Sequence, residues 1–234
     1  PACGVIRDVV VENANPTATL QIKELSFEKV STVALAGAEI VAYDAASQNV
    51  YVTSGDGLQI VNLEDPTNPV LVNTILPTTF GLSSNEISSV AVRDGIVAAA
   101  VPNANTQAPG NILFLNTDGT NIGTAITGPL PDMITFSPDG NTVLTANEGE
   151  PNDDYTVDPQ GTITIVDVTD GTIGTTTQVD FTAFNGQQAQ LEADGVRIFG
   201  PGATVAQDLE PEYITVSEDN TTAYIALQEN NAIA

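Results

Sequence analysis

The stretch Pro131–Asp170, PDMITFSPDGNTVLTANEGEPNDDYTVDPQGTITIVDVTD, contains two short β-runs, an acidic loop and a third β-run. Apolar residues alternate or cluster in MITFS and NTVLTA, and the SPDGN between them has Pro and Gly where a turn needs them, which predicts a β-hairpin. A third strand is expected at TITIVDV, from Thr162 to Val168, just after Gly161. The intervening EGEPNDDYTVDPQ is too rich in Pro, Asp and Asn to continue a strand and predicts a loop.

This unit recurs along the chain. The anchors Tyr43, Val92, Phe136 and Val216 occupy equivalent places in the first strand of each repeat, at spacings of 49, 44 and 80 residues. The first two spacings match a four-stranded propeller blade, and the third matches a blade plus about 35 inserted residues. A glycine opens the third strand of the first three repeats, and each first strand ends in an acid-containing turn, so a propeller is favoured over a β-sandwich.

The predicted fold class is therefore all-β, a β-propeller of four-stranded blades. We expect an arm or linker at residues 1–24 and a partial propeller at 25–234, with blades near 38–80, 86–128, 131–184 and 210–234 and an insertion at 185–209. About three and a half blades do not close a ring, because propellers usually need four to eight. We therefore expect the chain to be a fragment of a longer protein.

The composition is strongly acidic. Five Lys plus Arg oppose 30 Asp plus Glu, for a formal net charge of −25, and from residue 31 onward only Arg93 and Arg197 oppose 26 acids. Such a surface repels nucleic acid and anionic membranes and attracts cations. The simpler interpretation of the acid excess as a whole is a solubilised surface.

Several residue types are missing. The chain has no histidine or tryptophan and one cysteine, Cys3, which excludes a Cys/His zinc site and the Ser-His-Asp and Cys-His catalytic pairs. No 18-residue apolar run predicts a membrane span, and the start lacks the pattern of a signal peptide, so for an exported protein we expect the signal to have been removed.

Carboxylates recur just before the first strand of the repeats. Glu39, Asp132 and Glu212 each lie four residues before an anchor, and Glu210 precedes Glu212. In a propeller these positions ring the mouth of the central channel, on the face that also carries the loop between the second and third strands. Converging carboxylates raise each other's pKa unless a cation is bound, and oxygen ligands alone favour Ca²⁺ or Mg²⁺.

The acidic loop of the third repeat belongs to the same face by this geometry. It adds Glu148, Glu150, Asp153, Asp154 and Asp158, whose spacing is not that of an EF-hand. We hypothesise a divalent cation here; alternatively the acids only solvate a rim or cap turns. The insertion, with a short helix expected at AQLEADG and a tight turn at GPGA, either lines a ligand site or packs as a cap.

Three segments resemble a known family: AEIVAYD, the stretch Pro131–Asp167, and GVRIFGPGATVAQDLEPEYITVSEDNTTAYIALQENNAIA. They are similar to the choice-of-anchor I family of bacterial surface proteins, often labelled mesenchyme-specific cell surface glycoprotein or, in cyanobacteria, atypical alkaline phosphatase. The resemblance covers roughly residues 25–234. It implies a propeller of about seven blades, secretion, and attachment to the cell surface, hence an extracellular or cell-surface location.

We therefore expect a non-catalytic surface propeller that binds divalent cations and serves in cell-envelope structure, adhesion or interaction with other envelope proteins or polysaccharide. The alternative is a calcium-dependent phosphoesterase of the alkaline-phosphatase or phytase-like kind, with Asp132, Glu148, Glu150 and Glu212 as metal ligands and metal-bound water as nucleophile. Phytase-like propellers, which the resemblance borders on, use Lys and Arg to hold phosphate, and this chain has few. A redox or quinone-type enzyme is disfavoured by the absence of His and Trp.

Overall fold

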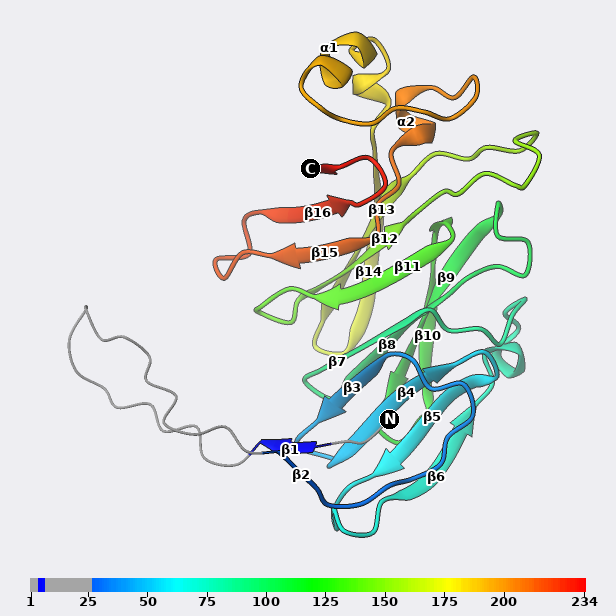
Figure 1. Ribbon diagram of the computed structural model, residues 1–234. Helices are drawn as coiled ribbons and strands as arrows, with labels where there is room; N and C mark the ends of the chain where they lie inside the picture. Colours follow the sequence, from blue (N-terminus) through cyan, green and yellow to red (C-terminus); the bar gives the residue numbers. More distant parts are fainter. Residues whose placement is uncertain (1–3, 7–26) are drawn as a thin grey trace, which may run out of the picture.

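A computed structural model describes residues 4–6 and 27–234 of the chain (Figure 1). From residue 41 onward the chain forms four consecutive antiparallel sheets, here called blades 1 to 4, each built in the order of the sequence. Blade 1 consists of β3 (Val41–Asp44), β4 (Asn49–Ser54), β5 (Gly57–Asn62) and β6 (Val70–Ile75), and blade 2 of β7 (Ser89–Arg93), β8 (Ile96–Val101), β9 (Pro109–Asn116) and β10 (Asn121–Pro129). Blade 3 consists of β11 (Pro131–Phe136), β12 (Thr142–Asn147), β13 (Thr162–Thr169) and β14 (Thr172–Asp180), and blade 4 of β15 (Tyr213–Val216), β16 (Ala223–Leu227) and β17 (Ala232–Ile233).

Short turns join the first two strands of each blade, as the sequence predicts. Between β7 and β8 the pair Asp94-Gly95 has φ values of 48° and 84°, the left-handed geometry of a tight two-residue hairpin. The SPDGN turn is closed by a hydrogen bond from the Gly140 amide to the Ser137 carbonyl at 2.9 Å. The hairpins fix the strand register, so alternate side chains of each blade face its two neighbours.

The core lies between successive blades. Tyr51 and Leu58 of blade 1 pack with Val97 and Leu113 of blade 2 in one cluster. The opposite face of blade 2 packs against blade 3 in a second cluster. Leu144 and other residues of blade 3 pack with blade 4 in a third cluster. The blades follow one another in chain order in Figure 1, from cyan at the bottom to red at the top, so equivalent strand ends of neighbouring blades lie on the same face.

The segment between blades 3 and 4 carries most of the helix. It contains the 3-10 turn η2 (Thr182–Phe184), α1 (Gln188–Ala193) and α2 (Val205–Asp208); a further 3-10 turn, η1 (Pro77–Phe80), follows blade 1. Helix α1 confirms the helix expected at AQLEADG, and a turn lies at residues 201–202 as expected, whereas α2 was not expected. Phe181, Val205, Ala206 and Leu209 pack with Leu227 of β16, so the insertion caps blade 4.

The described N-terminal residues form one small pair of strands, in which β1 (Gly4–Ile6) pairs antiparallel with β2 (Phe27–Lys29). The remainder of the expected arm at residues 1–24 lies outside the described residues. Within residues 4–6 and 27–234, no helix has the length and apolar character needed to cross a membrane.

Candidate functional site

Two of the predicted carboxylates lie at the start of the innermost strands of blades 3 and 4. Asp132 is the second residue of β11, where the Pro131 carbonyl accepts a hydrogen bond from Ser88 Oγ of blade 2 at 2.5 Å. Glu212 directly precedes β15, and its amide donates to the Ala226 carbonyl at 3.0 Å. Both side chains are half-buried.

The acidic loop between β12 and β13 folds back onto the same strand end. The amides of Glu148 and Gly149 donate to the Leu130 and Pro129 carbonyls at 3.0 and 3.2 Å. Gly149 has φ +70°, and a Cβ there would lie 2.5 Å from the backbone of Gln160, so only glycine lets the loop close this way. The closed loop places Glu148 beside the start of β11.

Blade 4 adds the carboxylates of Glu210 and Glu229, whose backbone segments are held together by the buried side chain of Asn230. Its Oδ1 accepts from the Glu210 amide at 3.0 Å, and its Nδ2 donates to the Arg197 and Asp208 carbonyls at 3.0 and 2.5 Å. Asn230 is fully buried in the turn between β16 and β17. It therefore ties the segment before β15 to the turn that carries Glu229.

These segments bring six carboxylates to one face, which we call the acidic face: Asp132, Glu148, Glu150, Glu210, Glu212 and Glu229. Burial, and then the charges of Asp132, Glu150, Glu212 and Glu210, raise the pKa of Glu148 to about 8. Burial, followed by Glu229 and then Glu150, raises the pKa of Glu210 to about 7. Burial also raises the pKa of Asp132 and, together with Asp132 and Glu229, that of Glu212.

Positive charge does not compensate the acidic face. In the described part of the chain the one ion pair joins Arg93 Nε to Asp94 at 3.5 Å, at the hairpin end of β7. Arg93 also donates to the Pro138 carbonyl of the next hairpin. Arg197 stacks on Phe199, with its guanidinium carbon 5.0 Å from the ring centroid. The raised pKa values therefore reflect burial first, and then repulsion among carboxylates that have no cationic partner in the described residues.

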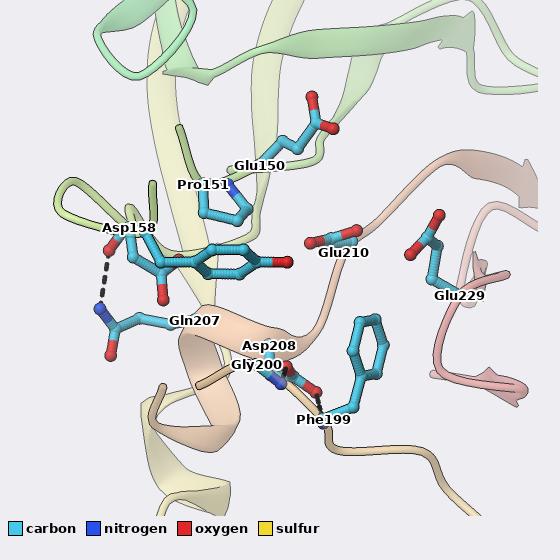
Figure 2. Close-up of a pocket in the computed structure, with 10 residues that line it drawn as sticks. Glu150, Pro151, Asp158, Phe199, Gly200, Gln207, Asp208, Glu210 and Glu229 are labelled. Atoms are coloured by element: carbon cyan, nitrogen blue, oxygen red, sulfur yellow. Dashed lines mark hydrogen bonds between the residues drawn. The ribbon is translucent and has the colours of Figure 1, made fainter. Parts of the chain in front are cut away.

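A cavity of about 70 Å³ lies beside the acidic face, between the loop after β12, the insertion and blade 4 (Figure 2). Its lining comprises Glu150, Pro151, Tyr155, Asp158, Phe199, Gly200, Gln207, Asp208, Glu210 and Glu229. Asp208 is buried and supports the wall, because its carboxylate accepts from the amides of Phe199, at 2.9 Å, and Gly200. The Asp158 carbonyl accepts from Gln207 Nε2 at 2.7 Å, while Asp158 Oδ1 is buried and has no hydrogen-bond partner.

The structure separates the predicted residues into three groups. Asp132, Glu148, Glu150, Glu210 and Glu212 meet on the acidic face. Asp158 lies in the cavity wall, where burial and the charge of Asp208 raise its pKa. Glu39 and Asp153 are exposed, and Asp154 is engaged by Thr156, whose hydroxyl and amide donate to its Oδ1 at 2.6 and 3.2 Å and lower its pKa.

Sequence reasoning missed Glu229 and the supporting residues Asp208 and Asn230. Glu229 lies between the second and third strands of blade 4, the same place that the acidic loop occupies in blade 3. The repeat pattern therefore contained a signal for it. No comparable signal marks Asp208, which acts through the conformation of the insertion.

The insertion both caps blade 4 and lines the cavity, so it fulfils both alternatives that the sequence left open. Its apolar residues pack on blade 4, while Phe199, Gly200, Gln207 and Asp208 form a wall of the cavity. Across residues 4–6 and 27–234, no three His, Cys, Asp or Glu side chains are grouped closely enough to hold one metal ion between them as they stand.

The chain matches the protein-family model of the choice-of-anchor I domain over residues 39–234. No curated protein matches the sequence significantly. Among solved structures, the chain is similar to a chain of a nidogen/laminin complex, with 14% identity and a TM-score of 0.52, covering 92% of this chain and 64% of that one.

A second similar structure is the β-propeller domain of Cps50 (Swd1) from Myceliophteria thermophila. The identity is 11% and the TM-score 0.50, and the match covers 84% of this chain and 50% of that one. The chain thus spans half to just under two thirds of the length of these structures. The four antiparallel sheets together with these neighbours make the fold a β-propeller, as predicted.

Proposed function

Because the chain belongs to the choice-of-anchor I domain family and folds as a β-propeller, we propose that it is a surface-associated propeller that binds Ca²⁺ on its acidic face. Its role would be in cell-envelope structure, adhesion or interaction with envelope proteins or polysaccharide, in an extracellular or cell-surface location. The family supports the surface association.

The observation that carries the proposal is the pKa of Glu148, raised to about 8 by burial and by Asp132, Glu150, Glu212 and Glu210. A carboxylate in this position is costly to ionise, and the cost falls when either a proton or a metal cation is bound. At neutral pH and millimolar Ca²⁺, a divalent cation competes with the proton and neutralises several acids together.

Asp132, Glu148 and Glu212 are the residues proposed to hold the ion, because Asp132 lies among the charges that raise the pKa of both Glu148 and Glu212. The donor chemistry fits: carboxylate oxygens are the ligands that Ca²⁺ prefers, and residues 4–6 and 27–234 include no histidine or cysteine to compete. Since the acids do not surround a single point as they stand, Glu148 and Glu212 would rotate toward the ion and water would complete its shell. A bound Ca²⁺ would supply charge neutralisation and link blade 3 to blade 4.

The phosphoesterase alternative gains no specific support from the site. Phosphate recognition draws on Lys and Arg donors, and in the described residues Arg93 lies at the opposite strand ends while Arg197 is stacked on Phe199. We therefore keep the binding function as the conclusion.

Thermal unfolding in chelator and then in increasing Ca²⁺ tests the proposal. A ligand that binds only the folded state adds about 2.7 kcal/mol of stability at one hundred times its dissociation constant, which raises the melting temperature by several degrees. We expect this rise in the wild type and its loss in the double variant Asp132→Asn, Glu212→Gln. Glu218→Gln, an exposed acid in a hairpin turn, is the matched control. An unchanged melting temperature at about 10 mM Ca²⁺, roughly ten to one hundred times the dissociation constants of extracellular calcium modules, or an equal rise with NaCl of the same ionic strength, would contradict the proposal.

A further inference from the structure

The lining of the cavity beside the acidic face is mainly polar, but it includes three apolar side chains that a metal site does not need. Tyr155 and Phe199 lie on opposite segments, the acidic loop and the insertion, and remain 44% and 46% exposed, with Pro151 beside them. Large aromatic side chains left open to solvent around a cavity are typical of surfaces that contact a ligand. The cavity therefore offers contact area as well as charge.

Phe199 already holds one cation. The guanidinium carbon of Arg197 lies 5.0 Å from the centroid of the ring, within the range of a cation–π interaction. The ring itself lines the cavity (Figure 2). The ring therefore borders the cavity and is of a kind that attracts cations.

Hydrogen-bond acceptors in the cavity remain unused. Within the described residues, the carboxylates of Glu150, Glu210 and Glu229 receive no hydrogen bond or ion pair, and Figure 2 shows them on one side of the cavity, carried by three separate segments. Asp158 Oδ1, behind the opposite wall, also has no donor, but it is fully buried, so a ligand in the cavity does not reach it without a shift of the wall. Asp208, in contrast, is satisfied by two backbone amides.

We propose that this cavity binds the side-chain ammonium of a lysine presented by a protein partner. The three N–H donors of an ammonium suit carboxylates carried by three separate segments, whereas Ca²⁺ needs six to eight oxygens drawn around one point. Pro151, Tyr155 and Phe199 provide apolar contacts for the methylene stem.

The inference rests on the proposed function only in making the chain a surface interaction protein, and it specifies one class of partner. Its test uses Phe199 and Glu229, whereas the calcium test uses Asp132 and Glu212, although Glu150, Glu210 and Glu229 belong to the acidic face as well. A failure of calcium binding and a failure of lysine binding are therefore seen separately.

The test is a titration of the ¹⁵N-labelled chain with Nα-acetyl-lysine methylamide, followed by NMR chemical shifts, in chelator and again in Ca²⁺. We expect saturable shifts of the backbone amides around Tyr155, Phe199 and Glu229. Nα-acetyl-norleucine methylamide, which lacks the ammonium, serves as the uncharged analogue and should give no saturable shift. Glucosamine, the amino-sugar probe, should bind at least about fivefold more weakly, a difference of about 1 kcal/mol.

Two variants assign the binding to the cavity. Phe199→Leu keeps the apolar contact and removes the π face, and it should weaken binding about threefold to fivefold; Glu229→Gln should have a similar effect. Glu218→Gln, outside the cavity, should leave the affinity unchanged. Equal binding of the norleucine analogue, tighter binding of glucosamine, or wild-type affinity in both cavity variants would each overturn the assignment, as would the absence of a saturable shift.

Discussion

Replacing Glu148 by Gln should stabilise the chain at alkaline pH and leave its stability unchanged near pH 4.5. The pKa of Glu148 is raised from 4.5 to about 8 in the folded protein, chiefly by burial and then by Asp132. Between these values the unfolded chain loses a proton that the folded chain retains, so the free energy of unfolding falls as pH rises from about 4.5 to 8. Above pH 8 the full cost of ionising Glu148 in the folded protein lowers the stability of the wild type, and Gln removes this cost because its amide does not ionise.

The magnitude follows from the pKa. At about 1.4 kcal/mol per pH unit, a rise from 4.5 to about 8 corresponds to an upper limit of roughly 5 kcal/mol. Glu148 is half-buried, and solvent screening reduces this limit, so we expect Glu148→Gln to gain about 1–3 kcal/mol at pH 9 in chelator. The gain should shrink when Ca²⁺ is added, because the ion neutralises the wild-type carboxylate but has less to bind in the variant.

Urea unfolding of the wild type, Glu148→Gln and the exposed control Glu218→Gln from pH 5 to 9 measures this difference. No histidine titrates in this range, but Glu210, whose pKa is raised to about 7, does, so the difference between the wild type and Glu148→Gln isolates the contribution of Glu148. A wild-type stability that stays level or rises between pH 5 and 8 would refute the reasoning. An equal gain in Glu218→Gln would do the same, since it would attribute the effect to net charge and not to the acidic face.

Two further substitutions test the framework that holds the acidic face. Gly161→Ala should destabilise the chain by about 2–4 kcal/mol in urea unfolding, because a Cβ there would overlap the Leu209 carbonyl oxygen. The control Gly186→Ala, where nothing lies within 4 Å of the added Cβ, should change stability by less than about 1 kcal/mol. Similar stability of the two variants would contradict the close approach of Gly161 to Leu209. Asn230→Ala leaves one buried and two part-buried backbone groups without this partner and should cost about 2–3 kcal/mol, with the melting temperature as the measurement and a loss below about 0.5 kcal/mol as the contrary result.

The β-propeller could be predicted from the sequence because each blade repeats a local pattern. The alternation around Phe136 and the turn at SPDGN specify one hairpin, and the spacing from Val92 to Phe136 specifies the next blade. Asp132, Glu210 and Glu212 could be placed on a common face by the same reasoning, since strand ends of equivalent phase share a face. The positions of these three residues therefore follow from the periodicity of the strands alone.

The remainder depends on long-range contacts that have no local pattern. Asn230 reaches Arg197 and Asp208, residues 33 and 22 positions away, and Asp208 in turn holds the backbone of Phe199 and Gly200. These contacts decide where the insertion lies, and neither strand alternation nor a turn motif encodes them. Asp154, which the loop composition placed with the metal ligands, instead forms a local turn with Thr156.

The two halves of the site therefore differ in their physical basis. The carboxylates of Asp132, Glu148 and Glu212 are brought together by the blade repeat, so the repulsion among them arises from the fold itself, and a cation relieves it. The cavity with Tyr155 and Phe199 exists because the insertion adds a wall to that face. Removing the π face of Phe199 should consequently affect lysine binding and not the calcium response, whereas Asp132→Asn with Glu212→Gln should affect the calcium response and leave the cavity intact. A loss of both responses in either variant would mean that the acidic face and the cavity form one site.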